Sequence, residues 1–271
     1  LGEPTGLASY QLGVALQLQN NDEQAIAAFK QALAKNPTTD QPLTDLVRLL
    51  VSTGKARDAE AYLDQHLKSH PDQLTAKILL ATVFRDSGRP ELARQLLTDI
   101  VAAQPAATGA WIGLAGLSPP ESAGRLAVLL KAHEQNPGDP QLGLALGAAH
   151  EKRQAYEAAI RVYEQVLKAG GGNDFIVNNL AVLLLDVRKD QASYARALKL
   201  AGRFAEGARH PFNLGVLGWA HYRNGQFGNA VQFLERAVAA SPAEVPQLRY
   251  YLGMAYLKTA NAVGAREELQ A

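Results

Sequence analysis

The fold is decided by a stretch that reads LATVFRDSGRPELARQLLTDIVAAQP over residues 80–105. Its apolar residues recur at spacings of three and four, with Leu80 and Phe84 before Gly88 and Leu97 after it. This spacing places one apolar stripe on each of two helices. Gly88 supplies the turn between them, and the final proline stops the second helix because it lacks an amide proton. We therefore predict a helix hairpin.

The same hairpin recurs at a constant period along the chain. Pro37, Pro71 and Pro105 are separated by 34 residues each, and each follows a helical run. Leucine followed by a small residue also recurs at matching positions, in the pairs Leu12-Gly13, Leu80-Ala81, Leu146-Gly147, Leu217-Gly218 and Leu252-Gly253. A period of this length is typical of an array in which neighbouring hairpins bury each other's apolar faces.

This pattern resembles the tetratricopeptide repeat family over nearly the whole chain. The resemblance implies an all-α fold, a right-handed α-α superhelix of about eight helix hairpins. We place the repeats in a single solenoid over 6–271, with the boundaries 6–39, 40–73, 74–107, 108–139, 140–173, 174–210, 211–245 and a truncated 246–271. The last repeat ends inside its second helix, so we expect either a longer native chain or an apolar face that another molecule covers.

Two repeats, 108–139 and 174–210, depart from the 34-residue period. In the first, Pro119-Pro120 at the internal turn predicts a first helix that stops near Leu117. In the second, we expect the extra residues to elongate the second helix, which Lys189-Asp-Gln opens. These irregularities either widen a groove where a partner docks or reflect neutral variation in loop length, and the sequence leaves both open.

Composition excludes several classes of site. The 271 residues include no Cys, which removes disulfides, Cys-ligated zinc and iron–sulfur clusters. Lys and Arg number 27 against 26 for Asp and Glu, so we expect no nucleic-acid partner selected by bulk charge. No segment approaches the 18 or so uninterrupted apolar residues of a membrane span. We predict no cofactor.

Motifs for catalysis and metal binding are also missing. The sequence has no Gly-x-Ser-x-Gly, Walker-type or His-Glu-x-x-His motif, so we do not expect an enzyme. Gly170-Gly-Gly is interpreted as a helix C-cap and joint, because a phosphate cradle needs a preceding strand. His66 and His70 have a spacing that can hold a metal, but no third ligand accompanies them, and we predict no metal site.

The tetratricopeptide resemblance implies that the first helix of each hairpin lines the concave side. First-helix positions outside the packing stripe are mostly apolar or aromatic, which predicts a groove for a hydrophobic ligand or helix. The alternative is ordinary packing between repeats, above all for Trp111, Phe212 and Tyr251. The predicted wall consists of Tyr10, Val14, Ile78, Ile112, Leu144, Phe175, Asn178, Val182, Leu185, Phe212, Trp219, Tyr222, Tyr250 and Met254.

The predicted function is a non-enzymatic binding scaffold. Its partner would be a protein segment, either an amphipathic helix or an apolar-anchored peptide. The alternative is a carrier or docking component for a lipid-like molecule such as a sterol, hopanoid or acyl chain. Residues 178–185 and 217–225 resemble segments of bacterial envelope tetratricopeptide proteins, often lipoproteins of polysaccharide export or lipid transport. That resemblance implies a periplasmic or outer-membrane location, with the cytoplasm as the alternative.

Overall fold

The computed structural model describes residues 6–206 and 210–270, and these form sixteen α-helices and one short 3-10 helix. The chain divides into two compact units, which we call the N-terminal unit (up to Gln135) and the C-terminal unit (from Asn136). The N-terminal unit contains α1 (Leu7–Leu18), α2 (Asp22–Lys35), α3 (Asp40–Ser52), α4 (Ala56–Ser69), α5 (Leu74–Asp86), α6 (Pro90–Ala103), α7 (Thr108–Gly116) and α8 (Ala123–Gln135).

The C-terminal unit repeats the same alternation of helices. It contains α9 (Pro140–Lys152), α10 (Tyr156–Lys168), α11 (Asp174–Asp186), α12 (Gln191–Ala201), the 3-10 helix η1 (Gly202–Phe204), α13 (Pro211–Arg223), α14 (Phe227–Ala240), α15 (Pro246–Lys258) and α16 (Ala262–Gln270). All the α-helices pair into consecutive hairpins, as the 34-residue period predicts.

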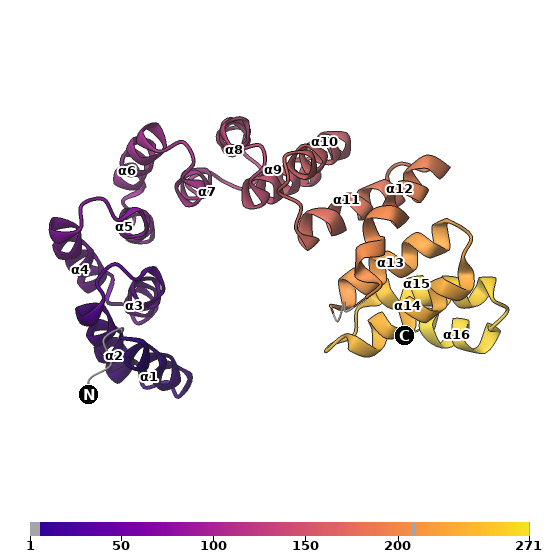
Figure 1. Cartoon of the computed structure of the whole chain (residues 1–271), viewed down its shortest axis with the longest axis horizontal. Coiled ribbons are helices and arrows are strands. Elements are labelled where there is room, and N and C mark those ends of the chain that lie inside the picture. The colour runs from indigo at the N-terminus through magenta and orange to yellow at the C-terminus, as the bar shows by residue number, and fades with distance from the viewer. Residues whose placement is uncertain (1–5, 207–209, 271) are drawn as a thin grey trace. The chain divides into compact units, whose positions relative to one another are not determined.

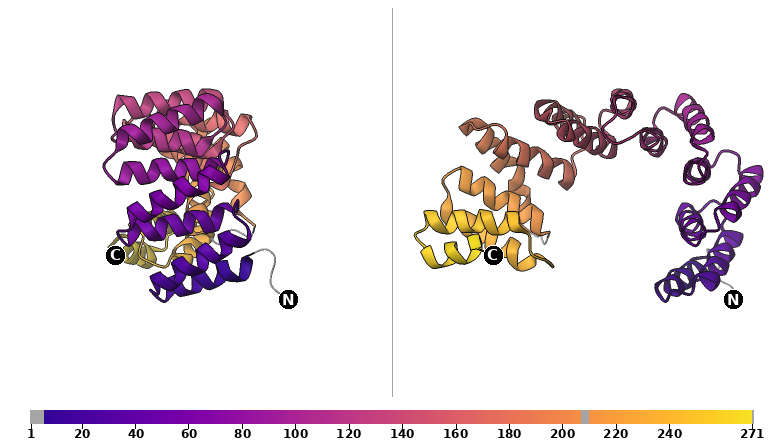
Figure 2. Two further views of the ribbon diagram at one scale, coloured as in Figure 1. Left: turned by 90° about the vertical axis from the view of Figure 1, so that its left-hand side faces the viewer. Right: turned by 180° about the vertical axis from the view of Figure 1, so that it is seen from behind.

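Within each unit the two helices of a hairpin take different places. In the N-terminal unit, α3, α5 and α7 lie on one side and α4, α6 and α8 on the other (Figure 1). Neighbouring first helices contact one another from α3 to α7 and from α9 to α15, and within a unit each second helix packs on the first helix that follows it. Figure 2 shows the helices of the N-terminal unit lying side by side. We call the side formed by the first helices the inner face of each unit.

Glycine allows the two helices of a hairpin to cross closely. A Cβ added at Gly147 would lie 2.3 Å from Cζ of the fully buried Tyr163, and one added at Gly13 would lie 2.5 Å from the Phe29 ring. At Gly218 the distance to Leu234 Cγ would be 2.6 Å. Because so short a separation forces atoms to shift, these crossings explain the recurring Leu-Gly pairs of the sequence.

The turns follow the sequence prediction closely. The chain adopts a left-handed conformation at Gly54 and Gly88, with φ of 78° and 74°, and at Asn20, with φ of 59°. Gly170 ends α10 in the same way, and the N–H of Gly171 donates to the Val166 carbonyl at 2.9 Å. This Schellman-type arrangement confirms the interpretation of the triple glycine as a helix C-cap.

The two irregular repeats behave differently. Helix α7 ends at Gly116, next to the predicted stop at Leu117. The predicted elongation of the second helix after residue 189 is wrong, because α12 ends at Ala201 and tightens into η1. The tighter turn directs Phe204 into the core, where its side chain is almost fully buried. Burial of this ring therefore favours the tight 3-10 turn over a straight continuation of α12.

Ion pairs connect successive hairpins on the side of the second helices. Arg89 donates to both carboxylate oxygens of Glu60, at 2.9 and 2.6 Å. Arg188 holds Glu157 in the same way in the C-terminal unit, at 3.0 and 2.6 Å. Two parallel bonds fix the orientation of a guanidinium against a carboxylate, so these pairs help to set the register between neighbouring hairpins.

Candidate functional site

The predicted wall residues of the N-terminal unit lie on its inner face and are partly buried. Tyr10 and Val14 of α1 pack on the apolar core of this unit. Ile78 of α5 lies close to Gly109, the second residue of α7, and Ile112 is on α7 itself. All four side chains are partly buried, so this part of the wall consists of the edges of side chains that pack between helices.

A buried carboxylate dominates the inner face between α1 and α3. Asp45 accepts hydrogen bonds from the Tyr10 hydroxyl at 2.9 Å and the Gln41 amide at 3.0 Å, and it pairs with Arg48 at 3.3 Å. Burial raises the pKa of Tyr10, and the hydrogen bond to Asp45 adds to the effect. The network holds Tyr10 as a neutral donor, so this face is polar where the sequence predicts an apolar wall.

The C-terminal unit divides its predicted wall residues between core and surface. Leu144, Asn178 and Val182 are partly buried on α9 and α11. Leu185 is 0% exposed and belongs to the core, so it does not line a surface. Leu185 is buried because α11 contacts a first helix on each side, α9 and α13.

Two predicted phenylalanines lie at the starts of first helices. Phe175 is the second residue of α11 and is 66% exposed. Phe212 is the second residue of α13, and the centroid of its ring lies 5.6 Å from that of the His210 ring. The alternative that Phe212 is packed away between repeats is wrong, because it is among the exposed large side chains.

The centre of the C-terminal inner face is a stack of aromatic rings. Trp219 of α13 lies between Tyr222 and Tyr251, with ring centroids 4.6 and 4.2 Å apart and planes within 8° of parallel. Its indole N–H donates to Asp186 Oδ1 at 3.1 Å. Trp219 is only 6% exposed, so it supports the surface from below and is not the ligand-facing ring that the sequence predicts.

A partly exposed apolar rim adjoins this stack. Tyr250, Met254 and Leu257 are spaced by four and three residues, which places them on one face of α15. Tyr250 is 49% exposed, with its ring 6.4 Å from Trp219, and Leu257 is 52% exposed. Tyr222 is partly exposed beside them. We call these four residues the aromatic rim.

Burial keeps the phenols of this region neutral. It raises the pKa of Tyr251 to about 12, with smaller contributions from Asp186 and Tyr250, and the Tyr251 hydroxyl accepts a hydrogen bond from Gln247 at 2.6 Å. Burial also raises the pKa of Tyr222. Both side chains therefore act as hydrogen-bonding, uncharged aromatic groups at physiological pH.

Sequence reasoning missed Arg223 and Tyr194. The Arg223 guanidinium lies over the Tyr194 ring, 4.2 Å from its centroid, and 5.6 Å from the centroid of Trp219. It also donates a hydrogen bond to the Tyr194 hydroxyl. The spacing of four between Trp219 and Arg223 is the signal that places the two on one helix face, whereas nothing local points to Tyr194.

His66 of α4 and His70, the residue after its end, form a packing cluster. The rings of His66 and His70 stack at 4.7 Å, and a ring nitrogen of His66 lies 2.5 Å from the Gln73 amide oxygen. Among the described residues, no group of three or more metal-ligating side chains is found. Nor does any helix of the described ranges have the length and apolar character needed to cross a membrane.

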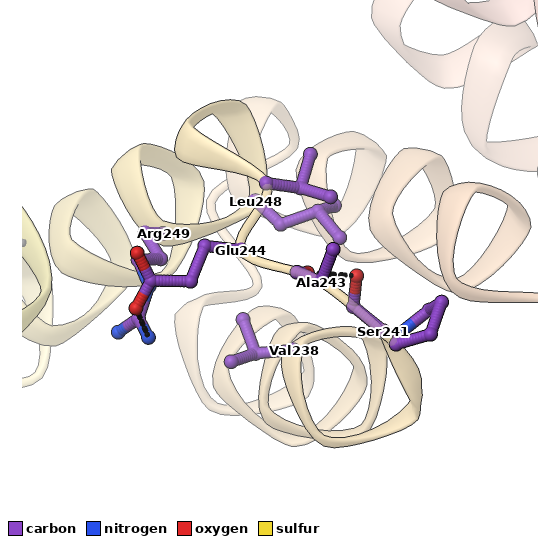
Figure 3. A pocket seen from close by; sticks show the side chains of 8 residues that line it. Val238, Ser241, Ala243, Glu244, Leu248 and Arg249 are labelled. Atoms are coloured by element: carbon purple, nitrogen blue, oxygen red, sulfur yellow. Dashed lines mark hydrogen bonds and ion pairs between the residues drawn. The ribbon is translucent and has the colours of Figure 1, made fainter.

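A separate cavity of about 280 Å³ lies between the end of α14 and the start of α15. Its apolar floor includes Val238 and Leu248, and the Glu244–Arg249 pair closes one side at 3.1 Å (Figure 3). Arg249 also bonds to Glu268 at 3.0 Å. Because its charged groups are already paired with each other, this cavity is less suited to a partner than the aromatic rim.

The fold and the inner faces define a helical-repeat scaffold that presents side chains from a series of first helices. Models of the tetratricopeptide repeat match residues 16–83, 142–173 and 216–271. The chain therefore belongs to the tetratricopeptide repeat family, and its fold indicates a scaffold for protein–protein interaction. A comparison with curated proteins finds no sequence match.

Two solved structures with a TM-score of 0.50 support the fold. The crystal structure of PilW, a type IV pilus biogenesis factor, has a TM-score of 0.50 at 15% identity, covering 71% of this chain and 88% of that one. A human IFIT1 dimer with m7Gppp-AAAA also has a TM-score of 0.50 at 15% identity, covering 98% and 67%. A tetratricopeptide repeat protein from Parabacteroides merdae has a TM-score of 0.43 at 15% identity, covering 93% and 99%.

Proposed function

We propose that the inner face of the C-terminal unit binds an apolar segment of a partner protein through the aromatic rim. The observation that carries this proposal is the stripe of exposed Tyr250 and Leu257 with partly buried Met254 between them, backed by the buried Trp219 stack. Burying clustered apolar side chains against another apolar surface is favourable, because it removes them from water. A rigid aromatic support lowers the ordering cost of binding, because Tyr222 and Tyr250 already pack against neighbouring rings.

The segment that fits this rim is an amphipathic helix or a peptide with apolar anchors. Side chains of a helix at positions i, i+3, i+4 and i+7 form a stripe of the same kind as the one on α15. Two such stripes can pack against each other over two helical turns. A partner of this kind needs no basic or acidic patch on the scaffold for its apolar contacts.

The test is selection of displayed random peptides of about 16 residues on the whole chain. We expect enriched peptides with aromatic or leucine anchors, and we expect Tyr250→Ser together with Leu257→Ser to abolish their recovery. The matched control is Leu92→Ser, which changes an exposed leucine on the second helix α6 and should leave recovery unchanged. Equal recovery by both variants would overturn the proposal.

A lipid-like ligand is the second outcome that the same surface allows. The cavity between α14 and α15 is poorly suited to a lipid, because the Glu244–Arg249 ion pair closes one of its sides (Figure 3). Native mass spectrometry after incubation with phospholipid vesicles separates the two functions. A bound lipid mass that disappears in the rim variant would replace the protein segment by a lipid.

We also propose a location in the bacterial periplasm or at the outer membrane. Its support is the resemblance of residues 178–185 and 217–225 to envelope tetratricopeptide proteins. Fractionation of the source cells, with an antibody against this chain, should find it with the envelope. Recovery in the cytosolic fraction alone would contradict this location and leave the binding proposal intact.

A further inference from the structure

Arg223 is partly buried, as are three arginines of the described residues that are held by glutamates. Arg89, Arg188 and Arg249 each pair with at least one glutamate. Arg223 instead lies between the rings of Tyr194 and Trp219 and donates to the Tyr194 hydroxyl. None of the carboxylates in the described ranges lies within ion-pair distance of it. The cation is held by rings and by one hydroxyl.

Asp186 is the acidic residue of the same cluster, but it forms no ion pair with Arg223. It accepts the indole N–H of Trp219 at 3.1 Å. A guanidinium carries five N–H donors, and the Tyr194 hydroxyl uses only a part of this capacity. A partly desolvated cation without a carboxylate gains most from an anion, because charge-assisted hydrogen bonds strengthen as water is excluded.

One residue of the aromatic rim, Tyr222, lies beside this cation. Tyr222 precedes Arg223 in the chain, and its ring stacks on the same Trp219 indole that Arg223 approaches. The charge of Arg223 lowers the pKa of both Tyr222 and Tyr251, against the larger effect of burial, so it is felt at both phenols. A ligand on the rim would therefore sit next to an unpaired positive charge.

We propose that the partner segment carries a side-chain carboxylate next to its apolar anchor, and that this carboxylate pairs with Arg223. This inference rests on the proposed function and names the chemistry of its partner. Charge complementarity selects the occupant: an apolar residue covers the rim while an Asp or Glu supplies the anion that the fold does not. The planar guanidinium, fixed by Tyr194, is already oriented for two parallel hydrogen bonds.

The experiment compares peptide pools selected from the same displayed library on wild type and on Arg223→Gln. The peptides are fused at their C-termini, so only side-chain carboxylates are available. We expect the wild-type pool to show Asp or Glu next to the apolar anchor. The Arg223→Gln pool should keep the apolar anchor and lose the acidic preference.

The matched control is Arg236→Gln on α14. Arg236 also lies over an aromatic ring, 5.4 Å from the Phe233 centroid, but on a second helix. Its pool should resemble the wild-type pool. Circular dichroism melting of each variant confirms that it is folded, and Arg223→Lys, which keeps the charge, should retain part of the preference if the first variant unfolds.

A single selected peptide then gives the size of the effect. Replacing its Glu by Gln should weaken binding to wild type by about tenfold, and should not weaken binding to Arg223→Gln. Added salt should weaken the wild-type complex further. A wild-type pool with apolar anchors but no acidic preference overturns this inference alone. A pool with no enriched peptides at all overturns the proposed function beneath it.

Discussion

The inner faces of the two units are both formed by first helices but differ in chemistry. In the N-terminal unit, Tyr10 and Arg48 both engage the buried carboxylate of Asp45. In the C-terminal unit, Trp219 organises a stack of rings, and Arg223 has no carboxylate within reach among the described residues. One face satisfies its own charges, whereas the other leaves an apolar rim and a cation for a partner.

The inner faces differ between the two units, but the close crossings of the two helices within a hairpin are alike in both. Gly13 faces Phe29 in the N-terminal unit as Gly147 faces Tyr163 in the C-terminal unit. Stability of a repeat array comes from these packing positions and from contacts between neighbouring hairpins. Residues on the inner face are therefore free to vary in chemistry, and function is read from them and not from the fold.

The largest expected effect comes from removing the centre of the aromatic stack. Trp219→Ala should lower the free energy of unfolding by about 3–5 kcal/mol, because a large buried ring leaves a cavity. Trp219→Phe keeps a ring between the two tyrosines and should cost clearly less. Urea unfolding followed by circular dichroism measures both. A cost below about 1 kcal/mol for the alanine variant would show that the rim does not depend on this support.

The next effect tests the shared crossings. Gly147→Ala should destabilise the chain by about 1–3 kcal/mol, since the new Cβ meets the ring of fully buried Tyr163. Gly13→Ala should have a cost of similar size against Phe29. The matched control is Gly228→Ala in α14, where nothing lies within 4 Å and the change should stabilise the helix by about 0.5–1 kcal/mol. Equal signs at Gly147 and Gly228 would contradict the packing argument.

A third prediction concerns the polar network of the N-terminal unit. Asp45→Asn should cost about 1–3 kcal/mol, because a buried acceptor of three groups loses its charge. The exposed Asp99→Asn serves as the control and should be close to neutral. Peptide recovery by the aromatic rim should survive Asp45→Asn. Loss of recovery would show that the two inner faces act together.

Sequence reasoning reached the hairpins because their determinants are local. Pro37, Pro71 and Pro105 each follow the end of a second helix by a short interval, and the turns lie at the predicted glycines and asparagine, which adopt a left-handed conformation. The misjudged segment after residue 189 depended on a distant fact, the burial of Phe204 in the core of the C-terminal unit. A spacing pattern does not contain that information.

The site was harder to predict for the same reason. The sequence places Trp219 on the inner face, but the tilt of its ring depends on Tyr251 from the next hairpin. Leu185 follows the same register and is buried because α11 is flanked by other first helices. Arg223 gains its significance from Tyr194, which is 29 residues away in the chain. The spacing of residues in the sequence predicts on which face of a helix a side chain lies, but the neighbouring helices determine how much of that side chain is exposed.

The smallest expected effect concerns the ion pairs that both units share. Hydrogen bonds from Arg89 lower the pKa of Glu60 below its usual 4.5, and those from Arg188 do the same for Glu157. A carboxyl whose pKa is lower in the folded state stabilises the fold above pH 4.5 or so, and this contribution is lost as the pH falls through the folded value. The Glu60 side chain is 24% exposed against 53% for Glu157, so solvent screens the N-terminal pair less.

Glu60→Gln should therefore destabilise the chain more than Glu157→Gln at neutral pH, and both variants should approach wild type at about pH 3. Each unit holds one of the two tryptophans, so Trp111 fluorescence in a Trp219→Phe background reports urea unfolding of the N-terminal unit, and Trp219 fluorescence in a Trp111→Phe background reports that of the C-terminal unit. Salt should reduce the Glu157 effect first, because it is the more exposed pair. A difference from wild type that persists unchanged at low pH would mean that the glutamates contribute by packing and not by charge.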